Sequence, residues 1–111
     1  MQYLLLIYED EKRFAKGFPE SEFAEYGAFG KKHAAAIQGG NALQPTGSAK
    51  SVRVRDGKAL TTDGPFAETK EQLGGYYLIE ANSIDEAAAT AAGIPAARYG
   101  SIEVRPIMVF S

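Results

Sequence analysis

The stretch TTDGPFAETKEQLGGYY, residues 61–77, combines turn-forming and titratable residues between two apolar, strand-like runs. Asp63 opens its Asp-Gly-Pro-Phe segment, in which Pro65 fixes φ and removes a hydrogen-bond donor. One interpretation is that Asp63 only caps its own turn. The other is that its carboxylate is held rigidly at the mouth of a cleft as a general base, with Phe66 as an apolar wall beside it.

The charged residues that follow, Glu68, Lys70 and Glu71, also allow two interpretations. They can form a solvated surface, where ion pairs contribute only ~0–1 kcal/mol, and we favour this for Glu71. Glu68 and Lys70 stay open as candidate ligand contacts.

Gly74-Gly75 lacks the spacing of a phosphate-binding loop and precedes a strand, so phosphate binding is not predicted. The next two residues, Tyr76 and Tyr77, point to opposite faces of that strand. One is expected in the core. The other would present its hydroxyl to a cleft or an interface, and Tyr76 is therefore a candidate ligand contact.

His33 is the one histidine of the chain and lies on the flank of the first predicted helix. It is either a boundary residue or the proton partner of Asp63, since an unperturbed imidazole titrates near neutral pH. Without a second histidine or any cysteine, no metal site is expected. Glu103 and Arg105 share one face of the last strand, where they either form an ion pair at a dimer interface or leave Arg105 to bind an anionic ligand.

The bulk composition is that of one ordinary globular domain spanning residues 1–111. Twelve basic and fourteen acidic residues leave a formal charge of −2, and the basic residues are scattered; no nucleic-acid partner is predicted. The absence of cysteine fits a reducing compartment. No segment reaches the ~20 apolar residues of a membrane span, and no signal peptide is evident, so a cytoplasmic location is expected.

Apolar periodicity predicts a doubly buried strand at 2–8, and then a helix from Ser21, its N-cap, to Gln38, stopped by Gly39-Gly40-Asn41. The residues expected on its apolar face are Phe23, Tyr26, Gly27, Gly30, Ala34 and Ile37. Residues 41–46 are the candidate second strand.

The second half of the chain carries clearer local signals. Residues 51–62 form two alternating runs joined by Asp56-Gly57, which predicts a hairpin with a type I′ turn. A strand is expected at 75–81, then a helix to Ala92 that opens with the capping box of Ser83 and Glu86. The last strand spans 101–110, and Pro106 requires an edge position or a bulge.

These elements follow the order of a ferredoxin-like β-α-β-β-α-β sandwich with an inserted hairpin, an α+β fold. Two helices cover one face of such a sheet. The first and last strands are apolar on both faces, and a chain this short has nothing left to cover the second face. We therefore expect a homodimer packed sheet to sheet.

The segments TTDGPFAETKEQLGGYYLIEA, MQYLLLIY, VRVRDGKAL and PAARYGSIEVRPI resemble the DGPF group of the YCII-related proteins. The resemblance covers nearly the whole chain and implies a dimeric α+β barrel. A more distant YCII-like relative is a dehydrochlorinase of a chlorinated hydroxyquinol, which favours lyase-type acid–base chemistry. Other members lie beside sigma-factor genes. The His-Asp pair ascribed to better-known members is not matched, because His33 lies in a different motif, GKKHAAA.

The leading hypothesis is a protein that binds a small molecule in a cleft between helix and sheet, without metal or other cofactor. The 61–77 loop would form its lip, Asp63 and Phe66 would face inward, and Asp63 would act as base. His33 or a tyrosine would be the proton partner and Arg105 an anion anchor. The alternative is a non-catalytic dimeric module for interaction or regulation, linked to transcription.

Overall fold

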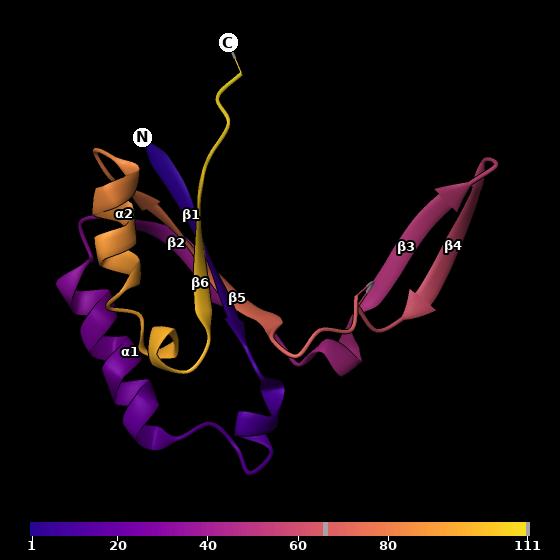
Figure 1. The fold of residues 1–111 in the computed structure, drawn as a ribbon, viewed down its shortest axis with the longest axis horizontal. Helices are drawn as coiled ribbons and strands as arrows, with labels where there is room; N and C mark the ends of the chain where they lie inside the picture. The colour runs from indigo at the N-terminus through magenta and orange to yellow at the C-terminus, as the bar shows by residue number, and fades with distance from the viewer. Residues whose placement is uncertain (66, 111) are drawn as a thin grey trace.

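The computed structural model describes residues 1–65 and 67–110. Its main sheet has four antiparallel strands in the order β2-β5-β1-β6: β2 (Ile37–Ala42), β5 (Gln72–Glu80), β1 (Gln2–Glu9) and β6 (Ser101–Pro106). Helices α1 (Glu20–Lys32) and α2 (Ile84–Ala91) both lie on one face of this sheet (Figure 1). The predicted ferredoxin-like α+β fold is confirmed. Within the described residues, no helix is long and apolar enough to cross a membrane.

Alternation along β1 divides the sheet into a covered face and an open face. Tyr3, Leu5 and Ile7 are buried under the helices, whereas Leu4 and Leu6 point to the opposite face and are half-buried. The strand predicted at 2–8 is confirmed. Its central position in the sheet explains why it is apolar on both faces.

The first helix differs from its prediction at both ends. It begins after Pro19, which offers no side-chain cap, so Ser21 is not the N-cap. It ends at Lys32 with His33 as C-cap, and the chain then enters β2 at Ile37, ahead of the strand expected at 41–46. The two glycines of β2 were misread as a helix stop. A Cβ at Gly40 would lie 2.6 Å from the Tyr76 carbonyl oxygen, so a bare backbone is required there.

The buried stripe of α1 also differs from the predicted one. Glu22 and Phe29 are buried and Tyr26 packs against the core, but Phe23 is 65% exposed. Phe23 contacts Phe18 instead, with ring centroids 4.8 Å apart. Glu22 points inward because it binds Arg13, a contact between distant segments that helical periodicity does not contain.

The other predicted elements of the second half are present. Ser83 accepts a hydrogen bond from the Glu86 amide at the start of α2, while Glu86 accepts one from the Asn82 amide. The last strand stops at Pro106, earlier than predicted, and lies at the sheet edge as proline requires. Three short 3₁₀ turns complete the fold: η1 (Glu11–Phe14), η2 (Thr46–Ser48) and η3 (Pro95–Arg98).

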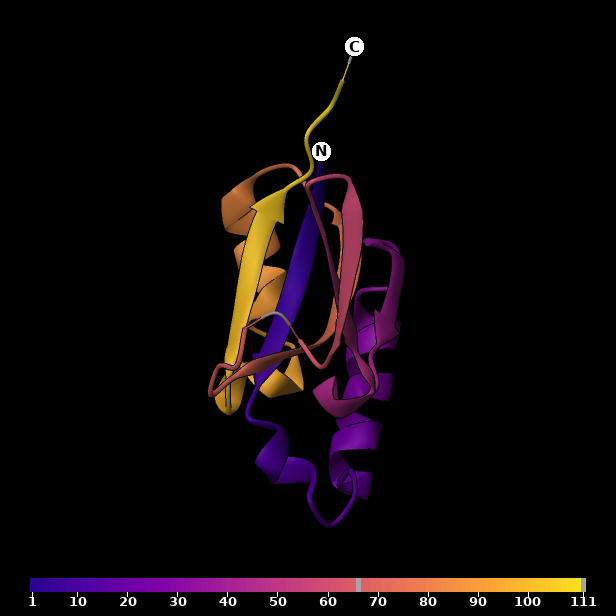
Figure 2. The ribbon, with the colours of Figure 1, turned by 90° about the vertical axis from the view of Figure 1, so that its right-hand side faces the viewer.

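The predicted hairpin forms a separate two-stranded sheet of β3 (Lys50–Arg55) and β4 (Lys58–Asp63), here called the arm. Its turn residues Asp56 and Gly57 have φ of 52° and 73°, as a type I′ turn requires. The arm stands away from the domain on the side opposite the helices (Figure 1), and in the turned view it lies in front of the sheet (Figure 2). One face of the main sheet is thus covered by the two helices, and the arm lies on the side of the other face.

Candidate functional site

A cleft of about 780 Å³ lies between α1, η1 and the ends of β2 and β5. Five aromatic side chains line it from the helix side of the sheet: Phe14, Phe18, Phe23, Tyr26 and Tyr77. Tyr76 also borders it, but Tyr76 stands opposite Leu6 and its ring points to the open face. Among the described residues, the charged ones that line it are Glu9 and Glu11. An apolar concavity with few, clustered polar groups is the usual form of a small-molecule site.

Ring contacts, most of them between residues close in sequence, build the aromatic wall. Phe14 stacks on Phe18 with centroids 5.2 Å apart, and Phe18 lies 6.1 Å from Tyr26. On the sheet side, Tyr77 contacts Phe29 at 5.2 Å. These ring pairs fix the cleft walls in place, because each offset or tilted pair adds about 0.5–1.5 kcal/mol to its area burial.

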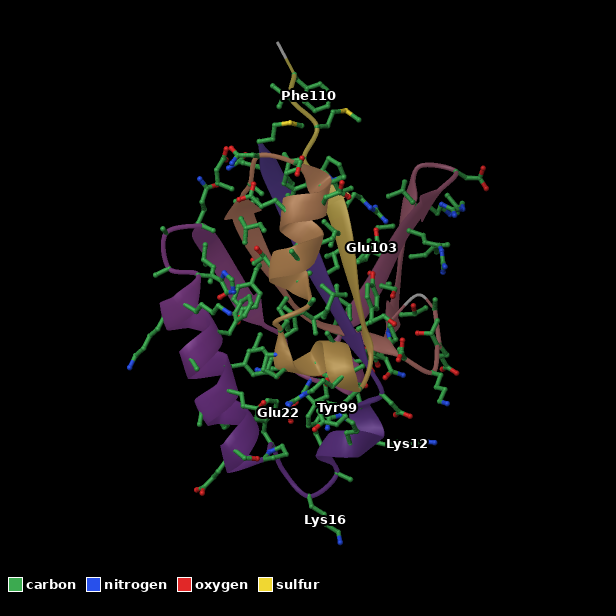
Figure 3. The ribbon with its side chains drawn as sticks, turned by 60° about the vertical axis from the view of Figure 1, so that its left-hand side comes forward. Lys12, Lys16, Glu22, Tyr99, Glu103 and Phe110 are labelled. Atoms are coloured by element: carbon green, nitrogen blue, oxygen red, sulfur yellow. The ribbon has the colours of Figure 1, made fainter. Side chains whose placement is uncertain are left out.

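Arg13 holds the floor of this region together. Its Nη2 lies 3.0 Å from a Glu9 carboxylate oxygen and 2.8 Å from a Glu22 carboxylate oxygen. Both glutamates are buried, with residue exposures of 7% for Glu9 and 3% for Glu22. The guanidinium also stacks on the Tyr99 ring at 3.8 Å. Glu22 and Tyr99, which flank it, are labelled in Figure 3. Arg13 thereby ties η1, and with it Phe14, to α1 and the end of η3.

Glu11 is fixed by a different partner. One carboxylate oxygen accepts a hydrogen bond of 2.7 Å from the Thr46 amide, and the other accepts the Thr46 hydroxyl. Thr46 begins η2, the turn that leads into the arm. Glu11 thus places a negative charge at the cleft, and its hydrogen bonds to Thr46 of η2 fix the position of that charge.

Burial favours the neutral form of two cleft tyrosines, Tyr26 and Tyr77. Burial raises the pKa of Tyr26, and the charges of Glu9, Tyr77 and Glu22 raise it further. Burial also raises the pKa of Tyr77. At neutral pH both hydroxyls can donate hydrogen bonds, and neither serves as a phenolate base.

These shifts predict a loss of stability in alkali. A tyrosine in the unfolded chain ionises near pH 10, while folded Tyr26 keeps its proton. The contribution of Tyr26 to the free energy of unfolding is therefore complete below about pH 10, and it is lost as the pH rises above that value. We expect the urea midpoint to fall between pH 9 and pH 11, and to fall less in Tyr26→Phe. An equal fall in both proteins would contradict the assignment.

The residues predicted from the DGPF segment lie elsewhere. Asp63 ends β4 at the root of the arm, pairs with Lys50 at 2.7 Å, and its side chain is 87% exposed. The expectation that it faces inward at a helix–sheet cleft is wrong for the single chain, because the hairpin carries it away from the helices. Phe66 lies outside the described residues. Tyr76 borders the cleft through its place on β5, but it stands opposite Leu6, so its side chain points to the open face. There its hydroxyl accepts a 2.9 Å hydrogen bond from Asn41.

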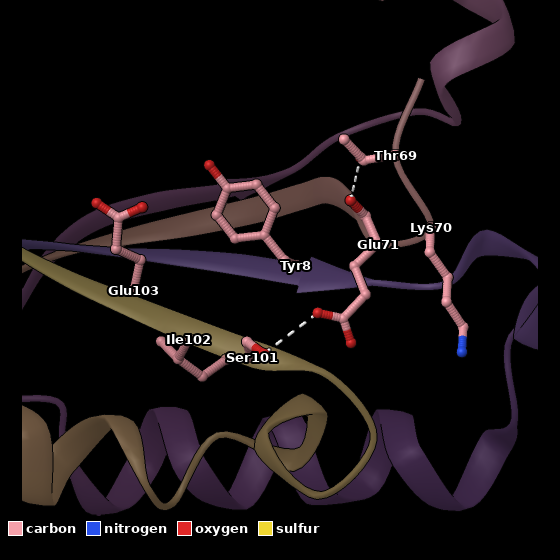
Figure 4. Close-up of a pocket in the computed structure, with 7 residues that line it drawn as sticks. All are labelled: Tyr8, Thr69, Lys70, Glu71, Ser101, Ile102 and Glu103. Atoms are coloured by element: carbon pink, nitrogen blue, oxygen red, sulfur yellow. Dashed lines mark hydrogen bonds between the residues drawn. The ribbon is translucent and has the colours of Figure 1, made fainter. Parts of the chain in front are cut away.

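Lys70 and Glu71 border a second, more open depression on the open face, together with Tyr8, Ser101 and Glu103 (Figure 4). Glu71 accepts a hydrogen bond of 3.2 Å from the Ser101 hydroxyl. Glu68 is exposed near this place on the loop. The structure thus separates Lys70 and Tyr76, which were both candidate ligand contacts, into different cavities.

His33 and Arg105 are also apart from the cleft. The His33 ring lies 4.8 Å from the ring of Phe29, where it caps α1. Arg105 pairs with Glu103 of its own chain on the open face, so the ion pair envisaged across a dimer is made within one protomer. Neither residue lines the aromatic cleft, nor does Asp63.

No element or site is predicted between the strand at 2–8 and the helix that starts at Ser21, so the cleft residues between 9 and 18 carry no predicted role. A signal was present: Glu9 and Arg13, and likewise Phe14 and Phe18, stand four residues apart directly after a buried strand. Such pairs meet on one side of a helical turn. What the sequence lacks is the pairing of Arg13 with Glu22 and of Glu11 with Thr46, which cross between segments.

Comparison with known proteins supports the fold and the sequence resemblance. The family model described as YCII-related domain matches residues 1–111. A protein of Rhizobium meliloti (strain 1021), described as uncharacterized protein R00369, is 38% identical over 117 residues, covering 99% of this chain and 94% of its own. Among solved structures, 5-chloro-2-hydroxyhydroquinone dehydrochlorinase (TftG) from Burkholderia phenoliruptrix AC1100, in complex with 2,5-dihydroxybenzoquinone, matches with a TM-score of 0.54 at 17% identity. That match covers 97% of this chain and 94% of the other.

Proposed function

The chain belongs to the YCII-related family, and from that premise we propose that it binds a small ring-shaped organic molecule in the aromatic cleft. The carrying observation is the composition of the lining, which combines five aromatic rings with two carboxylates. No cationic side chain lines the cleft in the described part of the chain. The preferred ligand is therefore an uncharged phenol or a ring that carries an ammonium group.

Two contributions would stabilise such a ligand in the cleft: burial of its apolar surface and electrostatic attraction. Apolar surface removed from water contributes roughly 25 cal/mol per Å², which suits a flat ring between aromatic walls. A cation gains further from aromatic faces and from the negative charges of Glu9 and Glu11. An anion meets repulsion from the same carboxylates, so the earlier hypothesis of an anion anchored by Arg105 does not fit this cleft.

Acid–base chemistry is proposed at the same place. The dehydrochlorinase named above shares the fold, which makes a proton-transfer reaction a reasonable extension for this chain. Glu11 is the group we assign as proton acceptor, because its carboxylate is held at the cleft by Thr46. The proton donor would be Tyr26, whose hydroxyl is protonated at neutral pH and stays so in alkali, since burial raises its pKa. Asp63 and His33 keep this role only if another chain brings them to the cleft.

Ligand charge gives the direct test. In a thermal-shift assay, phenol, hydroquinone and benzylammonium should raise Tm by several degrees at about 100 times their dissociation constants, where binding stabilises by about 2.7 kcal/mol. Benzoate should not. The 2,5-dihydroxybenzoquinone seen with the dehydrochlorinase ionises readily and should bind more weakly than hydroquinone.

The substitution Glu11→Gln removes a negative charge from the cleft and keeps the shape of the side chain, so the same assay shows how much this charge contributes to ligand binding. We expect it to weaken benzylammonium about tenfold, or ~1.4 kcal/mol, and to leave phenol within about twofold. Tight benzoate binding to the wild-type chain would overturn the proposed ligand class. A blank with every ring compound would favour the interaction module instead.

We also propose that the open sheet face forms a homodimer. It carries Leu4, Leu6 and Leu78 in a central strip, edged by Glu103 and Arg105 on β6. Exposed apolar strips of this kind mark interaction surfaces in soluble proteins, and a twofold pairing buries the same strip of both copies. Sedimentation equilibrium tests it, and a monomer at all concentrations would contradict it.

A further inference from the structure

The arm has apolar side chains that the described part of the chain leaves exposed. Val52, Val54 and Leu60 are 63%, 61% and 50% exposed. Its strands pair with each other, and in the described residues neither packs extensively on another helix or strand. An isolated two-stranded hairpin is marginally stable in water, so its apolar side chains call for a partner.

The register of the arm gives it two unlike faces. Val52 stands opposite Thr61, and Val54 opposite Ala59, so these four make one mainly apolar face. The other face contains Leu60 beside the basic residues Arg53, Arg55 and Lys58. An amphipathic hairpin of this kind is suited to lie against a surface through its apolar side.

The root of the arm sets its direction. Lys50 and Asp63 form an ion pair across its first rung, and the Gly64 amide donates a 2.6 Å hydrogen bond to the Ala49 carbonyl oxygen. The Ser51 hydroxyl donates to the Gly64 carbonyl oxygen at 2.8 Å. Thr46, just before the arm, is held by Glu11. A preset direction lowers the entropy that binding must overcome.

The position and charge of the arm indicate which partner it fits. It stands on the side of the open sheet face (Figures 1 and 2), so a copy seated on that face comes within its reach. The arm has four basic and two acidic residues, a net charge of +2, while the rest of the chain has eight basic and twelve acidic residues, a net of −4. Opposite charges of this kind orient and speed association.

We propose that each arm is a clasp exchanged between two copies of this chain. In the homodimer proposed above, on which this inference rests, the apolar face of each arm packs on the body of the partner beside the sheet-to-sheet contact. A twofold axis gives both copies the same contact. The root of the arm then carries Asp63 to the boundary between the subunits.

Two matched substitutions on opposite faces of the arm test the clasp. Val54→Asp places a charge on the apolar face, and Leu60→Asp places the same charge on the basic face at similar exposure. By sedimentation equilibrium, we expect Val54→Asp to raise the dimer dissociation constant at least about 100-fold, since the twofold contact suffers the loss twice. Leu60→Asp should stay within about threefold. Circular dichroism checks that both variants fold.

Mixed-label NMR identifies the molecule that the arm touches. In a dimer of one ¹³C-labelled and one unlabelled copy, isotope-filtered contacts from the Val52 and Val54 methyl groups to the unlabelled copy are expected. Contacts only within the labelled copy would overturn the clasp, as would an unchanged dimer in Val54→Asp. A wild-type monomer would overturn the dimer and the clasp together.

Discussion

Arg13→Met should lower the free energy of unfolding by about 3–5 kcal/mol, the usual cost of removing one partner from a buried ionic group. The substitution leaves Glu9 and Glu22 buried without their shared cation. It also removes the guanidinium from the Tyr99 ring, which holds η3 near η1. Urea unfolding followed by circular dichroism measures the change.

Two further variants test whether the stability loss in Arg13→Met comes from leaving the two glutamates without a cation. The triple variant Glu9→Gln, Arg13→Met, Glu22→Gln should recover most of the loss, because no unpaired charge then remains in the interior. Lys12→Met removes a neighbouring exposed cation and should change stability by less than about 0.5 kcal/mol. If the triple variant is as unstable as Arg13→Met, packing and not charge compensation dominates at this site.

Ala42→Phe should abolish binding of benzylammonium and phenol. Ala42 lines the cleft at the end of β2, and a ring there occupies the space assigned to the ligand. We expect the dissociation constants to rise at least about 100-fold, or ~2.7 kcal/mol, in isothermal titration calorimetry. Tm should hold or rise, because the new ring fills an apolar cavity.

Ala28→Phe is the matched control. Ala28 is an exposed alanine on α1 that does not line the cleft, so the same added volume should leave binding unchanged. Equal weakening by both substitutions would place the ligand elsewhere. Loss of binding with a strongly lowered Tm would show unfolding in place of occlusion, and a smaller substitution, Ala42→Val, would then decide.

The sequence predicts the fold where the signals are local. The hairpin turn at Asp56-Gly57, the Ser83 cap and the apolar β1 each depend on a few adjacent residues, and all three are present. The end of α1 failed because Gly39 and Gly40 look like a helix stop. Both glycines pair with β5, and only Gly40 makes a contact too close for a side chain. This pairing depends on residues almost forty positions away.

The candidate site was predictable only in outline. The expected architecture predicts a cleft between helix and sheet, but it leaves open whether Tyr76 or Tyr77 faces that cleft. Asp63 drew attention because an Asp-Gly-Pro-Phe segment is chemically conspicuous, but the hairpin that precedes it carries it to the open side of the sheet. The aromatic wall depends on how η1 folds back on α1, and that depends on Arg13 meeting Glu22.

The strand order of the main sheet constrains the time course of folding. β1 pairs with β5 and β6, and β2 pairs only with β5, so neither has a neighbour until residues 72–80 are available. During synthesis, the apolar strand β1 therefore stays unpaired until most of the chain has been made, and during refolding it stays unpaired until β5 or β6 reaches it. Such non-local pairing slows folding and exposes a segment prone to aggregation. The locally formed arm, in contrast, can close as soon as residue 63 has been made.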